Sequence, residues 1–205
     1  MKISEKYADY ILEETKKLLE IDSPSGYTKN VAEYVMEEYH KLGYKADMTV
    51  KGGVLVDLGG EDESNAVMLD THIDTLGGMV SEIKADGNLR IVPIGGLNAN
   101  NTEAENVRVV TRDGKIYTGV FQLDNASVHV NKEYSEKKRS FACMEVLLDE
   151  MVSTKEETRK LGIDVGDIVC FDPRTVITPS GYIKSRFLDD KLSVGILLGF
   201  ARFLK

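Results

Sequence analysis

One histidine of the sequence stands among carboxylates at a spacing that suits a metal site. His72 lies at the end of an apolar run, Ala66–Thr71, which we predict to be a strand. Residues two apart on a strand share a face, so Asp70, His72 and Asp74 are expected to point the same way. A carboxylate that accepts the second ring proton fixes the tautomer and leaves the other nitrogen for a metal. A His-x-Asp triplet is also common by chance, so a structural histidine is the alternative.

An acidic pair near the end of the sequence could supply the matching carboxylate. Asp189 and Asp190 follow Phe187-Leu188 at a predicted strand-to-helix junction. A carboxylate can bridge two divalent ions about 3.5–4 Å apart, and imidazole with carboxylate suits zinc, cobalt or manganese. The alternative is that acids simply favour helix N-termini, where the macrodipole attracts them. The sequence predicts His72 and Asp189 as metal ligands if one sheet edge brings them together.

The other residues with chemical potential carry weaker signals. His40 lies among charges near a helix end and is predicted to be solvated. His129 lies in the alternating run Ser127–Val130, which indicates a histidine of a sheet; approach to a neighbouring subunit's site is the alternative. The sequence has no Gly-x-Ser-x-Gly, phosphate-loop, His-Glu-x-x-His or Cys-x-x-Cys motif. Glycoside hydrolysis needs two carboxylates, but nothing singles out a pair among the 34 acids.

Apolar spacing and turn residues predict the elements that must position these side chains. Helices are expected over 5–20, from Thr28 to a left-handed Gly43, after the capping box Ser153–Glu156, and from Asp189 onward. The last helix has an apolar stripe made of Val194, Leu197, Leu198, Ala201 and Leu204. Further strands are expected over Tyr44–Val50, Val54–Leu58 and Tyr182–Phe187, with a hairpin over Arg108–Thr118 that turns at Asp113-Gly114 in two residues.

The arrangement of these elements predicts an α/β fold with an insertion. Residues 1–75 contain helices followed by strands, residues 76–175 contain short strands with turn signals, and residues 176–205 return to the first style. We therefore expect a catalytic α/β domain in two parts, 1–75 and 176–205, interrupted by a compact β-rich domain over 76–175.

Composition narrows the partners and the location. The net charge of -8 and pI of about 5.0 argue against binding to nucleic acid or anionic membranes, because phosphates would be repelled. No apolar stretch approaches the ~18 residues needed to span a bilayer, and the first residues lack the apolar core of a signal peptide. Cys143 and Cys170 lie in apolar runs, which favours two buried thiols over a disulfide. We predict a cytoplasmic protein.

Five stretches, in this order, resemble the glutamyl aminopeptidase family of metallopeptidases, which includes the tetrahedral aminopeptidases. They are Ser23–Tyr27, Met68–Gly77, Asp113–Gly119, Ser127–Val130 and Phe187–Asp190. The resemblance implies a zinc-peptidase-like α/β sandwich interrupted by a β-barrel-like dimerisation domain. It also implies a homo-oligomer built from dimers, and an enzyme that removes N-terminal residues from peptides with water activated at two divalent ions, zinc or cobalt.

The resemblance also implies roles for single residues. His72 would bind one metal, Asp74 would be the catalytic-site carboxylate that orients it, and Asp189 would bridge both metals; Asp190 would be a neighbouring acid. The sequence differs from many relatives at Thr75, where they have Glu, and at Asp70, where they have a small residue. Both differences alter the surroundings of the ligands, so substrate preference does not carry over.

The family's general-base Glu and its remaining ligands correspond to positions beyond Lys205. We therefore expect this polypeptide alone to bind metal weakly or not at all and to have no useful peptidase activity, since no positioned base is left to activate water. Two other functions stay open. One is a noncatalytic oligomerisation fragment with a vestigial His72, and the other is a carbohydrate hydrolase of the endoglucanase type.

Overall fold

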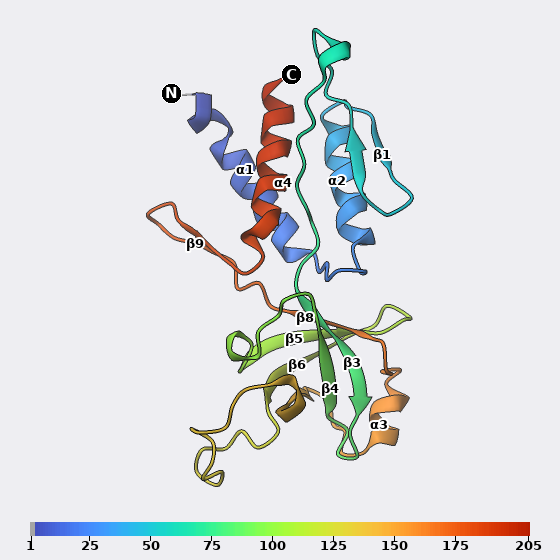
Figure 1. Ribbon diagram of the computed structural model, residues 1–205, viewed down its shortest axis with the longest axis vertical. Coiled ribbons are helices and arrows are strands. Elements are labelled where there is room, and N and C mark those ends of the chain that lie inside the picture. The colour runs from blue at the N-terminus through green and yellow to red at the C-terminus, as the bar shows by residue number, and fades with distance from the viewer. Residues whose placement is uncertain (1–2) are drawn as a thin grey trace. The chain divides into compact units, whose positions relative to one another are not determined.

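The computed structural model describes residues 3–205, and its helices follow the apolar spacing of the sequence. The helices are α1 (Ile3–Glu20), α2 (Lys29–Lys41), α3 (Lys155–Lys160) and α4 (Leu188–Phe203) (Figure 1). One face of α2 is buried, because Val31, Val35 and Tyr39 are at most 6% exposed. Gly43 follows this helix with a φ of +83°, a left-handed angle that glycine adopts without steric cost. The helix therefore ends where the sequence predicts.

Helices α1 and α4 pack side by side, and glycines permit the close approach (Figure 1). A Cβ added to Gly195 would lie 2.2 Å from Thr15 Oγ1, and one added to Gly199 would lie 2.3 Å from Ile11 Cγ1. Both distances are far inside van der Waals contact. The two glycines of α4 therefore set its distance from α1.

The predicted apolar stripe of α4 is right over most of the helix and wrong at its end. Val194, Leu198 and Ala201 are at most 4% exposed. Leu204 lies after the last helical residue, Phe203, and is 46% exposed. Helical spacing no longer places a residue on the buried face once the helix has ended.

Two short antiparallel hairpins lie in the same compact unit as α1, α2 and α4. They are β1 (Ala46–Met48) with β2 (Val54–Val56), and β9 (Val176–Ile177) with β10 (Ile183–Lys184). The predicted strands here were longer, over Tyr44–Val50, Val54–Leu58 and Tyr182–Phe187. The ends of these runs find no strand partner among the described residues, so the ladders stay two or three residues long.

Residues Leu76–Asp172 form a separate compact unit, inserted between the residues up to Thr75 and Pro173–Lys205. Its strands are β3 (Gly77–Ile83), β4 (Leu89–Ile94), β5 (Glu105–Val110), β6 (Ile116–Leu123), β7 (Met144–Leu148) and β8 (Ile168–Phe171). They close an antiparallel barrel in the order β3-β4-β7-β6-β5-β8, which leaves no open edge. Inside it the rings of Phe121 and Phe171 meet edge to face at 5.6 Å. The predicted α/β class with a β-barrel-like insertion is confirmed.

The β5–β6 hairpin is present, but its turn differs from the predicted two-residue turn. Arg108 pairs with Thr118 as expected. Thr111 N donates to Lys115 O at 3.0 Å, so the loop contains the three residues 112–114. Only Gly114 has a positive φ, at +81°. A three-residue hairpin loop combines an ordinary turn with one left-handed residue, which glycine supplies.

The capping box of α3 lies one residue later than predicted from Ser153–Glu156. The helix begins at Lys155, so Thr154 is the N-cap, and its Oγ1 accepts from Glu157 N at 3.3 Å. Glu157 Oε2 in turn accepts from Ser153 N at 2.8 Å. The repeated acids 156 and 157 allowed either register, and the helix start decided between them.

The cysteines form no disulfide in the described chain. Cys170 is buried as predicted, whereas Cys143 is only half-buried. Among the helices that the structure describes, none is long and apolar enough to cross a membrane.

Candidate metal centre

His72 lies in an extended segment that is not a strand. The strand predicted over Ala66–Thr71 is wrong, because this stretch pairs with no strand of residues 3–205 and is exposed to solvent; Val67, for example, is 84% exposed. An extended run becomes a strand only when a neighbour completes its hydrogen-bond ladder. Residues just after His72 are held instead by the segment after α1, where Thr75 N donates to Ser23 O at 2.8 Å.

The imidazole of His72 lies between two carboxylates from distant parts of the sequence. Its Nε2 is 3.1 Å from Asp189 Oδ1, and its Nδ1 is 3.2 Å from Asp74 Oδ1. Asp70 makes no hydrogen bond or ion pair with His72 in the described chain, so only one of the two expected neighbours reaches the ring. The side chains of His72 and Asp189 are 54% and 96% exposed, so an ion from solvent can reach both.

The two carboxylates raise the pKa of the His72 imidazole above its usual 6.5. Burial of part of the ring is the largest single effect and lowers the pKa, since desolvation disfavours the cation. The hydrogen bond to Asp189 and the contacts with Asp74 together outweigh it. The negative charges of Asp74 and Asp189 attract cations to the ring, and a metal ion would compete with the proton for Nε2.

Asp189 precedes the regular part of α4. Phe187 has a left-handed φ of +64°, Asp189 is extended (φ -84°, ψ 102°), and the regular helix begins after Asp190. The peptide bond between the two aspartates is cis. Because the Asp189 carboxylate hydrogen-bonds with His72, the attraction of a helix N-terminus for acids is not the whole account of its position.

A buried lysine that sequence patterns did not single out holds the beginning of α4. Lys191 is 1% exposed, and its Nζ donates to the carbonyl oxygens of Leu18 at 2.7 Å and Ile21 at 2.6 Å, at the end of α1. The last carbonyls of a helix lack partners within it, and a cation there also meets the negative end of the helix dipole. Lys191 therefore ties the residues next to Asp189 to α1.

The donor set fits part of a site for a divalent ion. An imidazole nitrogen and a carboxylate oxygen 3.1 Å apart can reach one ion at the usual distances of about 2.0–2.2 Å. Asp74 sits on the second ring nitrogen of His72, as outer partners of metal-binding histidines do. Within residues 3–205, no three His, Cys, Asp or Glu side chains form a group that could hold a metal. The described residues bring together two side chains of metal-binding type, His72 and Asp189, with the Asp74 carboxylate beside the ring.

The other two histidines lie away from this group. His40 is in the last turn of α2, and its Nε2 is 3.3 Å from the carbonyl oxygen of Ala46. The prediction that His129 lies in a sheet is wrong. The residue is exposed in the turns that connect β6 to β7. Asn131 Nδ2 donates to Asn125 O at 2.7 Å and closes this loop around His129, so the apolar alternation of the run does not make a strand.

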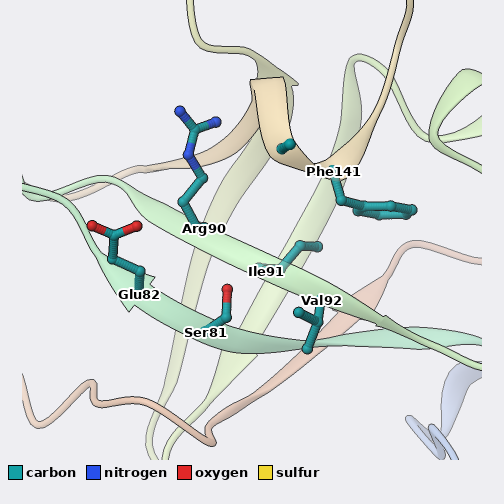
Figure 2. Close-up of a pocket in the computed structure, with 7 residues that line it drawn as sticks. Ser81, Glu82, Arg90, Ile91, Val92 and Phe141 are labelled. Atoms are coloured by element: carbon teal, nitrogen blue, oxygen red, sulfur yellow. The ribbon is translucent and has the colours of Figure 1, made fainter.

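A shallow hollow on the barrel is not part of the candidate metal centre. Its volume is about 360 Å³, and it is lined by Ser81, Glu82, Arg90, Ile91, Val92, Phe141 and Ala142 (Figure 2). The guanidinium of Arg90 donates to Met144 O at 2.8 Å and to Asp124 Oδ2 at 3.0 Å. Its charge is therefore paired with a carboxylate of the same barrel unit. None of the predicted site residues lines the hollow.

Comparison with known proteins agrees with the metallopeptidase class that this fold and donor set suggest. The model of the M42 glutamyl aminopeptidase family matches residues 52–205. The chain therefore belongs to the M42 glutamyl aminopeptidase family, and the resemblance predicted from its motifs is confirmed.

Two relatives that resemble this chain are named as aminopeptidases. YhfE of Bacillus subtilis (strain 168), named as a candidate aminopeptidase, is 46% identical over 187 residues, which are 91% of this chain and 54% of that protein. The solved structure of aminopeptidase APDkam598 from Desulfurococcus kamchatkensis matches with a TM-score of 0.85 and 31% identity, covering 96% of this chain and 52% of that one.

A third relative shows the fold at lower identity. The TET1 peptidase of Pyrococcus horikoshii, which can assemble into a tetrahedron or a large octahedral shell, matches with a TM-score of 0.79 at 24% identity, covering 94% of this chain and 56% of that one. The chain spans about half the length of the curated relatives it matches.

Proposed function

We propose that this chain belongs to a metal-dependent aminopeptidase that removes N-terminal residues from peptides. The observation that carries the proposal is the convergence of His72 Nε2 and Asp189 Oδ1 at 3.1 Å, with Asp74 on the opposite ring nitrogen. Membership of the M42 family supports the reaction class. In this proposal His72 binds one metal, Asp189 bridges two metals, and Asp74 orients His72.

Each of these residues has a distinct task. A divalent ion held here supplies a Lewis acid for the scissile carbonyl and lowers the pKa of water. His72 offers Nε2 to a metal only when its proton resides on Nδ1, where the Asp74 carbonyl can accept it at 3.3 Å and the Asp74 carboxylate lies 3.2 Å away. Asp189 has two oxygens on an exposed side chain, so it can serve two ions. Mixed nitrogen and oxygen donors favour zinc or cobalt.

The proposal extends to partners and location. Peptides are the substrates, and the net charge of -8 supports the exclusion of nucleic acid and anionic membranes as partners. We propose a homo-oligomer built from dimers through the barrel unit, supported by the assembly of the Pyrococcus horikoshii TET1 peptidase. A cytoplasmic location is supported by two cysteines that form no disulfide.

Hydrolysis of aminoacyl anilides by the protein purified from its native gene tests this function. We expect hydrolysis that a chelator abolishes and that zinc or cobalt restores. Asp189→Asn should lower the rate by more than about 100-fold, beyond the usual effect of a residue outside the ligand set. Asp70→Asn is the matched control, because Asp70 lies near His72 in sequence without bonding to it, and it should retain activity.

Two outcomes would replace the proposal. Cleavage of glucan without hydrolysis of anilides would favour the carbohydrate hydrolase. An intact oligomer that hydrolyses neither substrate, with or without added metal, would favour a noncatalytic oligomerisation role.

A further inference from the structure

The segment that follows α1 runs alongside the residues that follow His72. Thr75 N donates to Ser23 O at 2.8 Å, Ser25 N donates to Thr75 O at 3.2 Å, and Pro24 forms a parallel bridge with Thr75. Ser23 Oγ also donates to Ile73 O at 2.9 Å. Ser23 and Thr75 are 1% and 6% exposed, so these bonds are shielded from water. The two segments therefore form one small ladder next to the candidate metal centre.

One side chain of this ladder reaches the centre itself. The Ser25 hydroxyl donates to Asp74 Oδ2, while Oδ1 of the same carboxylate lies 3.2 Å from His72 Nδ1. A carboxylate held at both oxygens cannot rotate freely about its side-chain bonds. Asp74 is 43% exposed, so without the serine it could swing toward water.

The turn that carries Ser25 is fixed on its other side as well. The carbonyl oxygen of Ile21, two residues before Ser23, accepts from Lys191 Nζ at 2.6 Å. Tyr27 N donates to Pro24 O at 2.7 Å, which closes the turn around Ser25. The hydroxyl is therefore presented to Asp74 by a backbone with little freedom.

We propose that Ser25 is a positioning residue for the metal centre: by holding Asp74 against Nδ1 of His72, it keeps the ring proton on Nδ1 and leaves Nε2 for the metal. This inference rests on the proposed function for its consequence, but its first effect concerns the imidazole alone. Nδ1 has two acceptors within 3.3 Å, the carboxylate and the carbonyl of Asp74, whereas Nε2 has one, Asp189 Oδ1. The Asp74 carbonyl attracts the Nδ1 proton in any case, and the negative charge of the carboxylate strengthens that attraction only while the carboxylate stays in place.

Nitrogen–proton correlation spectra of the neutral His72 ring, recorded without metal, test the inference directly. Ser25→Ala should shift the ring toward Nε2–H relative to the wild type, because Asp189 Oδ1 remains as the acceptor on that nitrogen. Ser25→Thr keeps the hydroxyl and should restore the wild-type spectrum. Ser180→Ala removes an exposed hydroxyl elsewhere in the chain and should change nothing. Because Ser25 is itself exposed, the alanine variant should unfold at nearly the wild-type temperature.

Cobalt titration of the same proteins separates this inference from the proposed function. Ser25→Ala should bind cobalt about 10-fold more weakly than the wild type, the usual effect of losing an outer partner. If the wild-type protein purified from its native gene binds no cobalt, the proposed function fails while the tautomer shift still supports the role of Ser25. A wild-type tautomer in Ser25→Ala overturns the inference whatever the metal result, and so does a failure of Ser25→Thr to restore it.

Discussion

Lys191→Met tests whether the buried ammonium stabilises the junction of α1 and α4. Methionine keeps much of the length and volume of the lysine side chain but removes the hydrogen bonds of 2.7 Å to Leu18 O and 2.6 Å to Ile21 O. The Leu18 carbonyl still accepts from Ile21 N at 3.2 Å. The Ile21 carbonyl has no such second bond within the described backbone, so it bears most of the cost.

The expected loss follows from one unsatisfied acceptor rather than from two lost bonds. Leaving a buried acceptor without a partner costs about 1–3 kcal/mol. Removing the ammonium also relieves the cost of having buried a charge at 1% exposure, which offsets part of the two charge-assisted bonds. We therefore expect Lys191→Met to lower the free energy of unfolding by about 2 kcal/mol.

Urea denaturation of the wild type and two variants measures this difference. Lys29→Met is the matched control, because the Lys29 side chain is 80% exposed and lies 3.6 Å from Glu33, and it should change the free energy of unfolding by less than about 0.5 kcal/mol. If Lys191→Met is as stable as the wild type or more stable, relief of the buried charge dominates and the reasoning about the junction is wrong.

Three further variants test other features of the fold. Gly195→Ala should lower the free energy of unfolding by about 1 kcal/mol in thermal denaturation, since overpacking against α1 exceeds the gain in helix propensity; an unchanged stability would mean that α1 can move away. Thr154→Ala should cost about 1 kcal/mol by the same assay, because the N-cap of α3 is lost, and equal stability would contradict that cap. Arg139 lowers the pKa of Glu103 below its usual 4.5, so this carboxylate stabilises the fold above pH 4.5 and loses its effect as the pH falls through the lower folded value. The stability deficit of Glu103→Gln should therefore be constant from pH 6 to 8 and disappear in acid; a deficit that persists in acid would exclude the ion pair as its cause.

Local patterns in the sequence predicted the elements whose structure depends on near neighbours. The buried face of α2 and its end at Gly43 follow from helical spacing and from the one residue that accepts a left-handed angle freely. The run Ala66–Thr71 failed as a strand because strand formation depends on a partner that local sequence cannot specify. The capping register of α3 failed by one residue because two adjacent acids fitted the same motif.

The candidate site also combines contacts between near neighbours in the sequence with contacts between distant segments, and the two kinds were not equally predictable. The two-residue spacing predicted both Asp70 and Asp74 beside His72, but only Asp74 reaches the ring, because the run is not a strand. The approach of Asp189, 117 residues further along the chain, was expected only from motif order and the sheet-edge argument. Lys191 and Ser25 were not predicted in their roles, because a lysine on an amphipathic helix suggests solvent and a serine in a turn suggests only the turn.

Cobalt binding by matched histidine variants tests the central claim, that His72 and Asp189 hold a metal, most directly. The visible absorption of cobalt titrated into the protein purified from its native gene reports nitrogen and oxygen ligands. We predict that His40→Ala binds cobalt like the wild type, whereas His72→Ala and Asp189→Asn each weaken binding by more than about 10-fold. Wild-type cobalt affinity in His72→Ala would contradict the assignment of the metal centre.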